Sequence, residues 1–280
     1  MSPKNSVPVD LISSQVKLAL QEDVGQQDLT ADLISIDSIA TATIITRENA
    51  TLCGQAWCEE VFKQLDPSIT IDWHFSDGDK MQENDIICSL HGPARTLLTG
   101  ERTAMNFMQT LSATASIVQQ YVDQVSGLAV DILDTRKTIP GLRLAQKYAV
   151  LCGGGVNHRV GLYDGILIKE NHINAAGSIS AAVNQARTLH TDIAIEVEVE
   201  CIDELEQALV AEADIILLDN FDTSALENAV AINHDRARLE ASGNITLNNV
   251  RAIAETGVHR ISIGALTKNI LAIDLSMRFI

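Results

Sequence analysis

Proline and glycine are scarce in this 280-residue sequence, with 5 and 16 residues, and aromatic residues make up only 4% of it. Collagen-like and low-complexity chains both need far more glycine and proline. No apolar run approaches the ~18 residues of a membrane span, and the polar N-terminus lacks the apolar segment of a signal peptide. Because 46% of the residues are hydrophobic, we expect a folded, soluble protein that neither crosses a membrane nor is secreted.

Positive charge is also in short supply. The chain has 20 Lys and Arg against 37 Asp and Glu, which gives a formal net charge of -17. A surface this acidic repels phosphate polymers. We therefore expect no nucleic-acid partner.

The cysteines form neither a disulfide framework nor a zinc motif. Their number is odd and no two are spaced as CxxC. Reduced thiols in the cytoplasm fit this pattern best. The five are Cys53, Cys58, Cys88, Cys152 and Cys201.

The first part of the chain combines helical and strand patterns. Apolar residues recur at helical spacing over 9–21, and a second, long helical pattern covers 94–125. Strand patterns cover 42–46, 70–75 and 86–90. We predict an α+β domain over residues 1–115.

After residue 127, short apolar runs alternate with helical patterns. This alternation is typical of parallel βα units, in either a doubly wound sheet or an α/β barrel. Helical patterns cover 179–188, 202–211 and 247–256. The runs expected to form strands are 129–133, 165–168, 193–199, 215–218, 238–241 and 260–263.

Polar or glycine residues follow every one of these runs. In a parallel barrel all strand C-termini open on one face, which holds the active site, whereas a doubly wound sheet concentrates ligand groups at one switch point. We therefore predict an open, incomplete α/β barrel over residues 116–269. The last residues, 270–280, are expected to pack back on the first domain.

A basic stretch interrupts this acidic chain, because residues 135–163 contain no Asp or Glu. A basic run is usually a solvated face. Here, however, Arg136 and Lys137 directly follow a predicted strand, and His158 and Arg159 follow three glycines, positions that a barrel directs into its mouth. Arg forks and Lys point charges together suit a small ligand with carboxylate and phosphate groups. The stretch also contains Arg143 and Lys147.

Carboxylates are expected across the same mouth. Glu196, Glu198 and Glu200 alternate along one predicted strand and so share one side of it, and Asp219 ends the next strand. Carboxylates that face bound phosphates indicate a bridging Mg²⁺, which takes one or two protein carboxylates and keeps several waters. The alternative is that these acids only pair with the basic residues.

Two loops of small residues follow the last two predicted strands. They are Ser242-Gly243-Asn244 and Gly264-Ala265, and each leads into a helix. Backbone N–H groups at such loops commonly form a phosphate site in α/β barrels. The sequence has no P-loop motif and no GxGxxG, so nucleotide hydrolysis and dinucleotide binding lose their usual support.

Taken together, these segments closely resemble the quinolinate phosphoribosyltransferase family, also called carboxylating nicotinate-nucleotide pyrophosphorylases. The resemblance covers nearly the whole chain and is most specific over residues 134–172. The matching segments are 134–143, 147–150, 153–159, 167–172, 217–220 and 263–267.

The resemblance implies a sandwich domain at the N-terminus, an open α/β barrel at the C-terminus, and a homodimer with shared active sites that Arg102 of the partner completes. It also implies the reaction of quinolinate with phosphoribosyl pyrophosphate, with Mg²⁺, to give nicotinate mononucleotide, pyrophosphate and CO₂ in NAD biosynthesis.

The resemblance further implies a role for individual residues. Quinolinate would be bound by Arg102, Arg136, Lys137, His158, Arg159 and Lys169. Phosphoribosyl pyrophosphate would be bound by Lys137, Lys169, Glu198, Asp219, Ser242, Gly243, Asn244, Gly264 and Ala265. The implied catalytic residues are Lys137, Lys169, Glu198 and Asp219. Of these, Glu198 and Asp219 would hold Mg²⁺ directly or through water. The sequence departs from the family at Asn244, where many members have a second glycine.

Three alternatives compete with this interpretation. A related barrel transferase could act on another aromatic acid, but Arg and His recognition of two carboxylates argues against it. A Rossmann-like phosphoribosyltransferase would show adjacent acids followed by a Thr/Gly run, which this sequence lacks. A non-catalytic anion-binding protein would keep the basic residues but would have no need of Glu198 and Asp219 opposite them.

Overall fold

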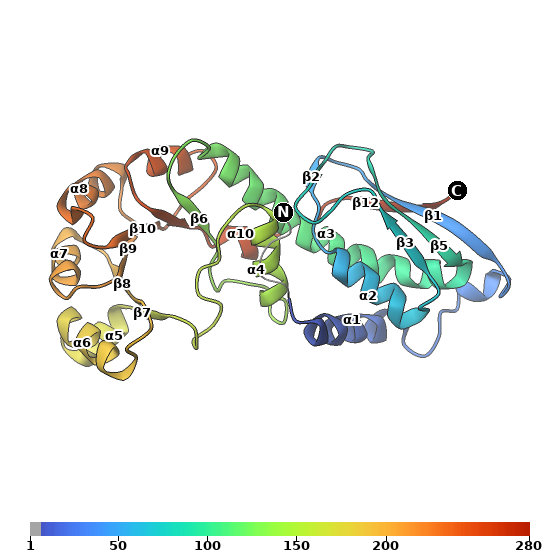
Figure 1. The fold of residues 1–280 in the computed structure, drawn as a ribbon, viewed down its shortest axis with the longest axis horizontal. Helices are drawn as coiled ribbons and strands as arrows, with labels where there is room; N and C mark the ends of the chain where they lie inside the picture. The colour runs from blue at the N-terminus through green and yellow to red at the C-terminus, as the bar shows by residue number, and fades with distance from the viewer. Residues whose placement is uncertain (1–6) are drawn as a thin grey trace. The chain divides into compact units, whose positions relative to one another are not determined.

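The computed structural model describes residues 7–280, which form two compact units (Figure 1). The first unit contains the described residues up to Gln119, Ile139–Gly154 and Asn269–Ile280. The second contains Gln120–Thr138 and Gly155–Lys268. The domain limits predicted from the sequence stay predictions, and the contacts group Ile139–Gly154 with the first unit rather than with the barrel strands.

The first unit is built on a four-stranded antiparallel sheet in the order β12, β1, β5, β3. In the register of β1 and β5, Ala42 lies opposite Leu90 and Ile44 lies opposite Cys88, and all four are buried. Alternation along the strands therefore gives the sheet one apolar face. The strands are β1 (Ile39–Thr46), β3 (Thr70–Trp73), β5 (Ile86–Pro93) and β12 (Leu275–Phe279), with a separate ribbon of β2 (Ala50–Thr51) and β4 (Lys80–Met81).

Helices share the core of this unit with the sheet. Trp57 and Phe62 of one helix and Met105 of another are buried in a single apolar cluster with β1 and β5. A Cβ atom on Gly100 would lie 2.6 Å from the Phe62 ring, so the absence of a side chain there permits close helix packing. The helices are α1 (Val9–Val24), α2 (Gln55–Leu65), α3 (Ala94–Gln124) and α4 (Arg143–Cys152), with a short 3₁₀ turn at Ala31–Leu33.

The second unit is a six-stranded parallel sheet in the order β6, β11, β10, β9, β8, β7. Its first strand in the chain pairs with its last, as in an α/β barrel, but within the described residues β6 and β7 end the sheet unpaired with each other. This order confirms the predicted open barrel. The strands are β6 (Asp131–Leu133), β7 (Ile166–Ile168), β8 (Ile195–Val199), β9 (Ile215–Asp219), β10 (Arg238–Ser242) and β11 (Arg260–Ser262).

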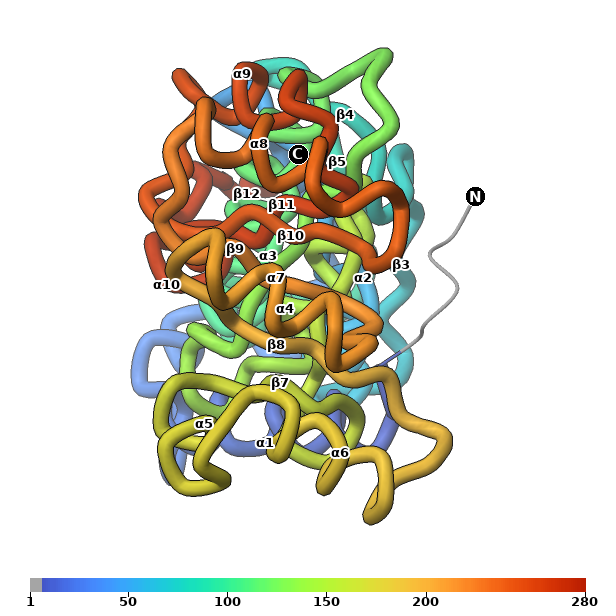
Figure 2. Tube along the Cα trace, turned by 90° about the vertical axis from the view of Figure 1, so that its left-hand side faces the viewer, coloured from blue at the N-terminus to red at the C-terminus, as the bar shows by residue number. Residues whose placement is uncertain are grey.

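Helices cover the outer side of this sheet. Figure 2 shows α6, α7 and α8 in front of the barrel strands, and Figure 1 shows the same helices outside them. Side chains fix two of the helix starts, because Ser178 accepts the N–H of Ala181 and Asp222 accepts that of Ala225. The helices are α5 (Glu170–Ala176), α6 (Ile179–Leu189), α7 (Ile202–Val210), α8 (Thr223–Asn233), α9 (Val250–Glu255) and α10 (Ala265–Lys268).

None of the helices in residues 7–280 combines the length and the apolar character that crossing a membrane requires.

Candidate active site

A cavity of about 260 Å³ lies in the second unit, where the barrel strands end. Strand register brings its polar walls together, because Ser242 of β10 lies opposite both Asp219 of β9 and Ser262 of β11. Glu198 of β8 lines the same cavity. The carboxyl ends of neighbouring parallel strands therefore supply one side of the site, as expected for a barrel.

Basic residues supply the other side. Arg136 and Lys137 follow β6, Arg159 follows the glycine-rich segment, and Lys169 follows β7; all four line the cavity. Nε of Arg136 is buried and has no hydrogen-bond partner within the described residues. A desolvated donor left unpaired costs about 1–3 kcal/mol. An anionic ligand in the cavity would remove that cost.

The charge of the cavity also acts on its own residues. Burial lowers the pKa of Arg159, and the positive charge of Arg136 lowers it further. The two guanidinium groups repel each other, and an anion bound between them would offset this repulsion. The arrangement therefore favours a ligand with more than one negative group.

Two carboxylates face these cations. Glu198 forms an ion pair with Lys169, and Asp219 accepts a hydrogen bond of 2.9 Å from the side-chain amide of Asn220. Burial raises the pKa of Asp219, the negative charge of Glu198 raises it further, and the two lysines of the cavity oppose this. Oxygen ligands whose like charges repel suit a hard divalent cation, so the pair fits Mg²⁺.

A second possible metal cluster lies deeper in the barrel. His158, Glu196 and Glu240 bring one ligand atom each within 4.8 Å of one another. However, the backbone N–H of Arg159 donates to Nδ1 of His158 at 2.9 Å, which places the ring proton on Nε2. Nε2 lies 2.9 Å from Glu196, so that atom is occupied as a donor and offers no lone pair to a metal.

A third cluster lies in the first unit, where Cys53, Asp77 and Cys152 meet. Burial raises the pKa of Cys53 well above its usual value, which disfavours the thiolate that binds metals. Asp77 is already used, because it accepts the N–H groups of Gly54 and Gln55 and the hydroxyl of Tyr148. This cluster therefore has no ready ligand set.

The predicted phosphate loops have tight backbones. Gly243 has φ +98°, and a Cβ atom there would lie 2.2 Å from Oδ1 of Asn220. Asn244 also has a positive φ, of 51°, and its side-chain amide donates to the same Oδ1 at 3.2 Å. Asn tolerates this left-handed conformation better than most residues. A Cβ atom on Gly264 would lie 2.9 Å from Cδ of Lys137, so this glycine allows the Lys137 stem to pack against the loop.

The structure brings together most, but not all, of the predicted site. Eight predicted residues line the cavity: Arg136, Lys137, His158, Arg159, Lys169, Glu198, Asp219 and Ser242. Four predicted phosphate residues do not line it: Gly243, Asn244, Gly264 and Ala265. Three basic residues lie in helices of the first unit: Arg102, Arg143 and Lys147. The basic stretch of the sequence is therefore divided between two units, and only part of it forms the site.

Sequence reasoning missed four lining residues. Two of them, Leu167 and Leu217, lie two positions before Lys169 and Asp219, so strand alternation could have placed them on the same inward side. The other two are Thr135 and Ser262.

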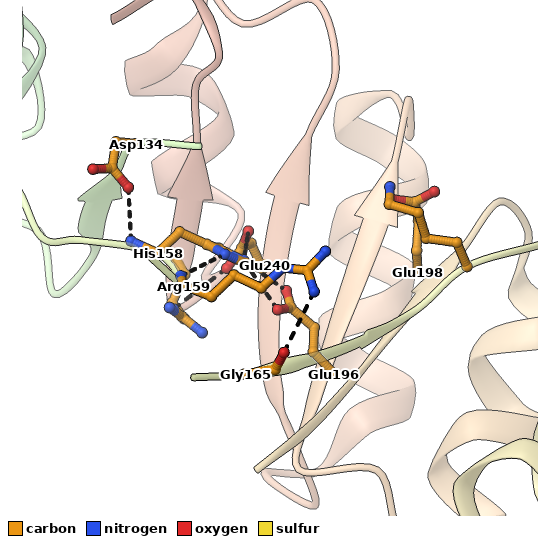
Figure 3. A network of polar contacts seen from close by, with 9 residues as sticks. Asp134, His158, Arg159, Gly165, Glu196, Glu198 and Glu240 are labelled. Carbon is orange, nitrogen blue, oxygen red and sulfur yellow. Dashed lines mark hydrogen bonds and ion pairs between the residues drawn. The ribbon is translucent and has the colours of Figure 1, made fainter. Parts of the chain in front are cut away.

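Beneath the cavity lies a buried charged cluster (Figure 3). Nε2 of His158 lies 2.9 Å from Glu196 and 3.4 Å from Glu240, and Nε of Arg260 lies 3.4 Å from Glu240. Burial lowers the pKa of His158, but its bonds to the two carboxylates outweigh burial and raise the pKa to about 9. The N–H of Arg159 at Nδ1 opposes this rise, because a ring protonated on both nitrogens would set two N–H groups against each other.

This combination of fold and cavity defines an α/β-barrel protein built to bind a small polyanion at its strand ends. Residues 28–112 match the family model of the quinolinate phosphoribosyl transferase N-terminal domain, and residues 114–278 match that of the C-terminal domain. Together these matches cover most of both structural units and leave out α1 of the first. The chain belongs to the quinolinate phosphoribosyltransferase family.

Individual relatives agree with this assignment. A nicotinate-nucleotide pyrophosphorylase structure from Francisella tularensis has 50% identity and a TM-score of 0.97 over 99% of this chain and 98% of its own. The Bacillus subtilis (strain 168) protein named "probable nicotinate-nucleotide pyrophosphorylase (carboxylating)" is 41% identical over 91% of this chain and 89% of its own. Quinolinate phosphoribosyltransferase (decarboxylating) 1b of Nicotiana tabacum is 38% identical over 94% and 81%.

Proposed function

We propose that this chain transfers phosphoribose from phosphoribosyl pyrophosphate to quinolinate and releases CO₂, with nicotinate mononucleotide and pyrophosphate as the other products. The observation that supports this most directly is the unpaired, buried Nε of Arg136 beside Arg159 in one cavity. Quinolinate offers two adjacent carboxylates, which match two guanidinium groups. Family membership makes this the natural substrate for such a pair.

In the proposed reaction the protein acts mainly by position and charge. As pyrophosphate leaves C1 of the ribose, positive charge develops there and the pyridine nitrogen adds to it. Lys137 and Lys169 would stabilise the pyrophosphate charge, while Glu198 and Asp219 would orient the ribose hydroxyls. The quaternary ring nitrogen then stabilises the carbanion left when the adjacent carboxylate departs as CO₂, and a proton from water takes the place of the lost carboxylate.

Mg²⁺ is part of this proposal. Glu198 and Asp219 would hold it, directly or through water, and when bound it would neutralise charge on the pyrophosphate. Removal of divalent ions with a chelator should abolish turnover, and added Mg²⁺ should restore it. Full activity in the chelator would exclude the metal.

One assay tests the activity itself. Purified protein is given phosphoribosyl pyrophosphate, Mg²⁺ and quinolinate, and both CO₂ and pyrophosphate are measured, with nicotinate and other aromatic acids as matched alternatives. The proposal requires equal amounts of CO₂ and pyrophosphate from quinolinate. Pyrophosphate release with another acid alone would favour the related barrel transferase, and no release would favour an anion-binding protein.

A shared active site in a homodimer is also proposed. Arg102 lies on α3 in the first unit and its side chain is exposed. The family resemblance assigns it to the partner's quinolinate site, so Arg102→Ala and Arg159→Ala chains should each be inactive alone. After mixing, about half of randomly paired dimers are heterodimers with one intact site, so activity should return to about a quarter of wild type. No recovery after chain exchange, followed by mass spectrometry, would exclude a shared site.

The proposal places the enzyme in the cytoplasm. All five cysteines lie within the described residues and have free thiols, and four of them are buried. Reduced cysteines are typical of that compartment. Fractionation of the source cells with antibody detection would test this placement.

A further inference from the structure

We propose that Glu240 and Arg260 are positioning residues of the quinolinate pocket, which act through His158 on Arg159. This inference rests on the proposed function. Neither residue lines the 260 Å³ cavity, so neither is expected to touch the substrate. Glu240 and Arg260 would affect quinolinate binding indirectly, because they hold His158 and Arg159, which do line the cavity.

Strand geometry places these two residues one layer below the site. Side chains at every second position of a strand share one face, so Glu240 lies on the same face of β10 as Ser242, which lines the cavity. The parallel register sets Arg260 of β11 directly opposite Glu240. Glu240 is fully buried, and its carboxylate lies between Arg260 and His158 at 3.4 Å from each.

His158 links this lower layer to the pocket. Its Nε2 faces Glu196 and Glu240, and its Nδ1 accepts the backbone N–H of Arg159 at 2.9 Å. The backbone N–H of His158 in turn donates to the buried Asp134 at 2.8 Å. Because protein groups engage both ring nitrogens, the ring fixes the backbone from which the Arg159 side chain extends into the cavity.

The negative charge of Glu240 acts on both Arg260 and His158. A second cavity, of about 360 Å³, is lined by both Arg159 and Arg260 as well as by His158 and Glu196. Glu240 compensates Arg260 from the barrel interior. Without the Glu240 charge, the partly buried guanidinium of Arg260 would keep Glu196 as its nearby carboxylate, and Nε2 of His158 would lose one of its two carboxylate partners. Arg159 would then shift away from the position in which it meets a carboxylate.

The test separates binding of the two substrates. In Glu240→Gln, which keeps the side-chain shape, we expect the KM for quinolinate to rise about tenfold or more, while the KM for phosphoribosyl pyrophosphate changes less than twofold. Arg260→Gln should have a similar effect, because it removes the second partner of the Glu240 carboxylate that holds Nε2 of His158. The double variant should be no worse than the more impaired single variant, because both changes break the same unit.

Two further variants control the comparison. Asp131→Asn breaks the exposed Arg238–Asp131 ion pair of the same unit, at 3.0 Å, and should change neither KM. Arg260→Lys keeps the charge and should raise the quinolinate KM by a smaller factor, again without a rise in the other KM. If Glu240→Gln does not fold, this variant provides the test instead. A purely structural role would lower the melting temperature and leave both KM values of the folded enzyme unchanged.

Several outcomes would overturn the proposal. An unchanged quinolinate KM in folded Glu240→Gln or Arg260→Lys, an equal rise in both KM values, or additive effects in the double variant would each exclude a positioning role. Wild-type protein that releases no CO₂ from quinolinate would instead contradict the proposed function, and this inference with it. Active wild-type enzyme with unaffected variants contradicts only the inference.

Discussion

The two units of this protein fill their interiors in different ways. In the first unit, large apolar side chains such as Trp57, Phe62 and Met105 pack into one cluster against the sheet. In the second unit, the barrel interior holds the buried charged residues Glu196 and Glu240 beside His158. The first interior is mainly apolar, whereas the second unit buries charged groups as well as apolar side chains such as Val197 and Ile216.

The energetic difference follows from solvation. Burial of apolar surface contributes roughly 25 cal/mol per Å² to folding. Buried ion pairs, in contrast, lose about as much on leaving water as they gain from each other, yet removal of one partner costs about 3–5 kcal/mol. We therefore expect substitutions in the apolar interior of the first unit to change stability, and substitutions of the charged groups inside the barrel to change function.

The largest effect on activity is expected for Arg159→Ala, a substitution of a charged residue in the second unit. Loss of the guanidinium would leave a desolvated substrate carboxylate unpaired, at a cost of several kcal/mol, so kcat/KM for quinolinate should fall about 100- to 1000-fold. Arg136→Ala should behave in the same way. Steady-state kinetics measure the fall, and thermal melting should show a fold that remains intact.

A matched control is Arg251→Ala. Arg251 is an exposed arginine of the same unit whose ion pair with Glu255 lies outside the cavity. It should keep wild-type turnover. Wild-type turnover in Arg159→Ala would contradict the assignment of the pocket.

For the first unit the expected loss is one of stability. Trp57 is fully buried in the apolar cluster, and its ring N–H donates to Gln15 at 2.8 Å. Trp57→Ala should lower the free energy of unfolding by about 3–5 kcal/mol, as measured by urea denaturation. If the remaining folded enzyme lost turnover without losing stability, the division of roles between the units would be wrong.

Sequence patterns predicted the residues that line the cavity better than they predicted the residues that support them. Alternation along β8 placed Glu196 and Glu198 on one face, and the position after each strand identified Arg136, Lys169 and Asp219. These inferences succeed because they depend only on local periodicity and on the common opening of parallel strand ends.

Long-range register explains what the sequence did not reveal. The pairing of Glu240 with Arg260 depends on how β10 and β11 align, and no local pattern encodes that alignment. In the same way, the apolar spacing of α4, which carries Arg143 and Lys147, predicts a helix but does not indicate which unit it packs on. The contacts that group this helix with the first unit involve residues distant in sequence, such as Tyr148 with Asp77.

A smaller effect is expected from the pH dependence of His158, which sharpens the comparison within the barrel interior. The two carboxylates raise the pKa of His158 to about 9, above ~6.5 for an unfolded histidine. A group whose pKa is higher in the folded state stabilises the fold while it is protonated. This stabilisation is complete below pH ~6.5 and disappears as the pH rises through about 9.

The variant His158→Asn measures this contribution. Wild type should be more stable than the variant at pH 6, and the difference should shrink by up to about 3 kcal/mol between pH 6 and pH 9.5. That value is an upper bound, because the N–H of Arg159 favours the neutral ring. A pH-independent difference from urea denaturation at each pH would mean that the ring stays neutral throughout.

The smallest effect is expected for an exposed ion pair, which completes the contrast with the buried one. Arg251 and Glu255 lie one turn apart on α9, with their Nε and Oε1 atoms 3.0 Å apart and both side chains about half exposed. Water already solvates both charges, so Glu255→Gln should lower the free energy of unfolding by no more than about 0.5 kcal/mol. The decrease should become undetectable at about 1 M salt, where the screening length is near 3 Å. Urea denaturation at low and high salt, set beside Glu240→Gln, makes the comparison direct. A loss from Glu255→Gln as large as that from Glu240→Gln would mean that burial does not determine what a charge contributes in this barrel.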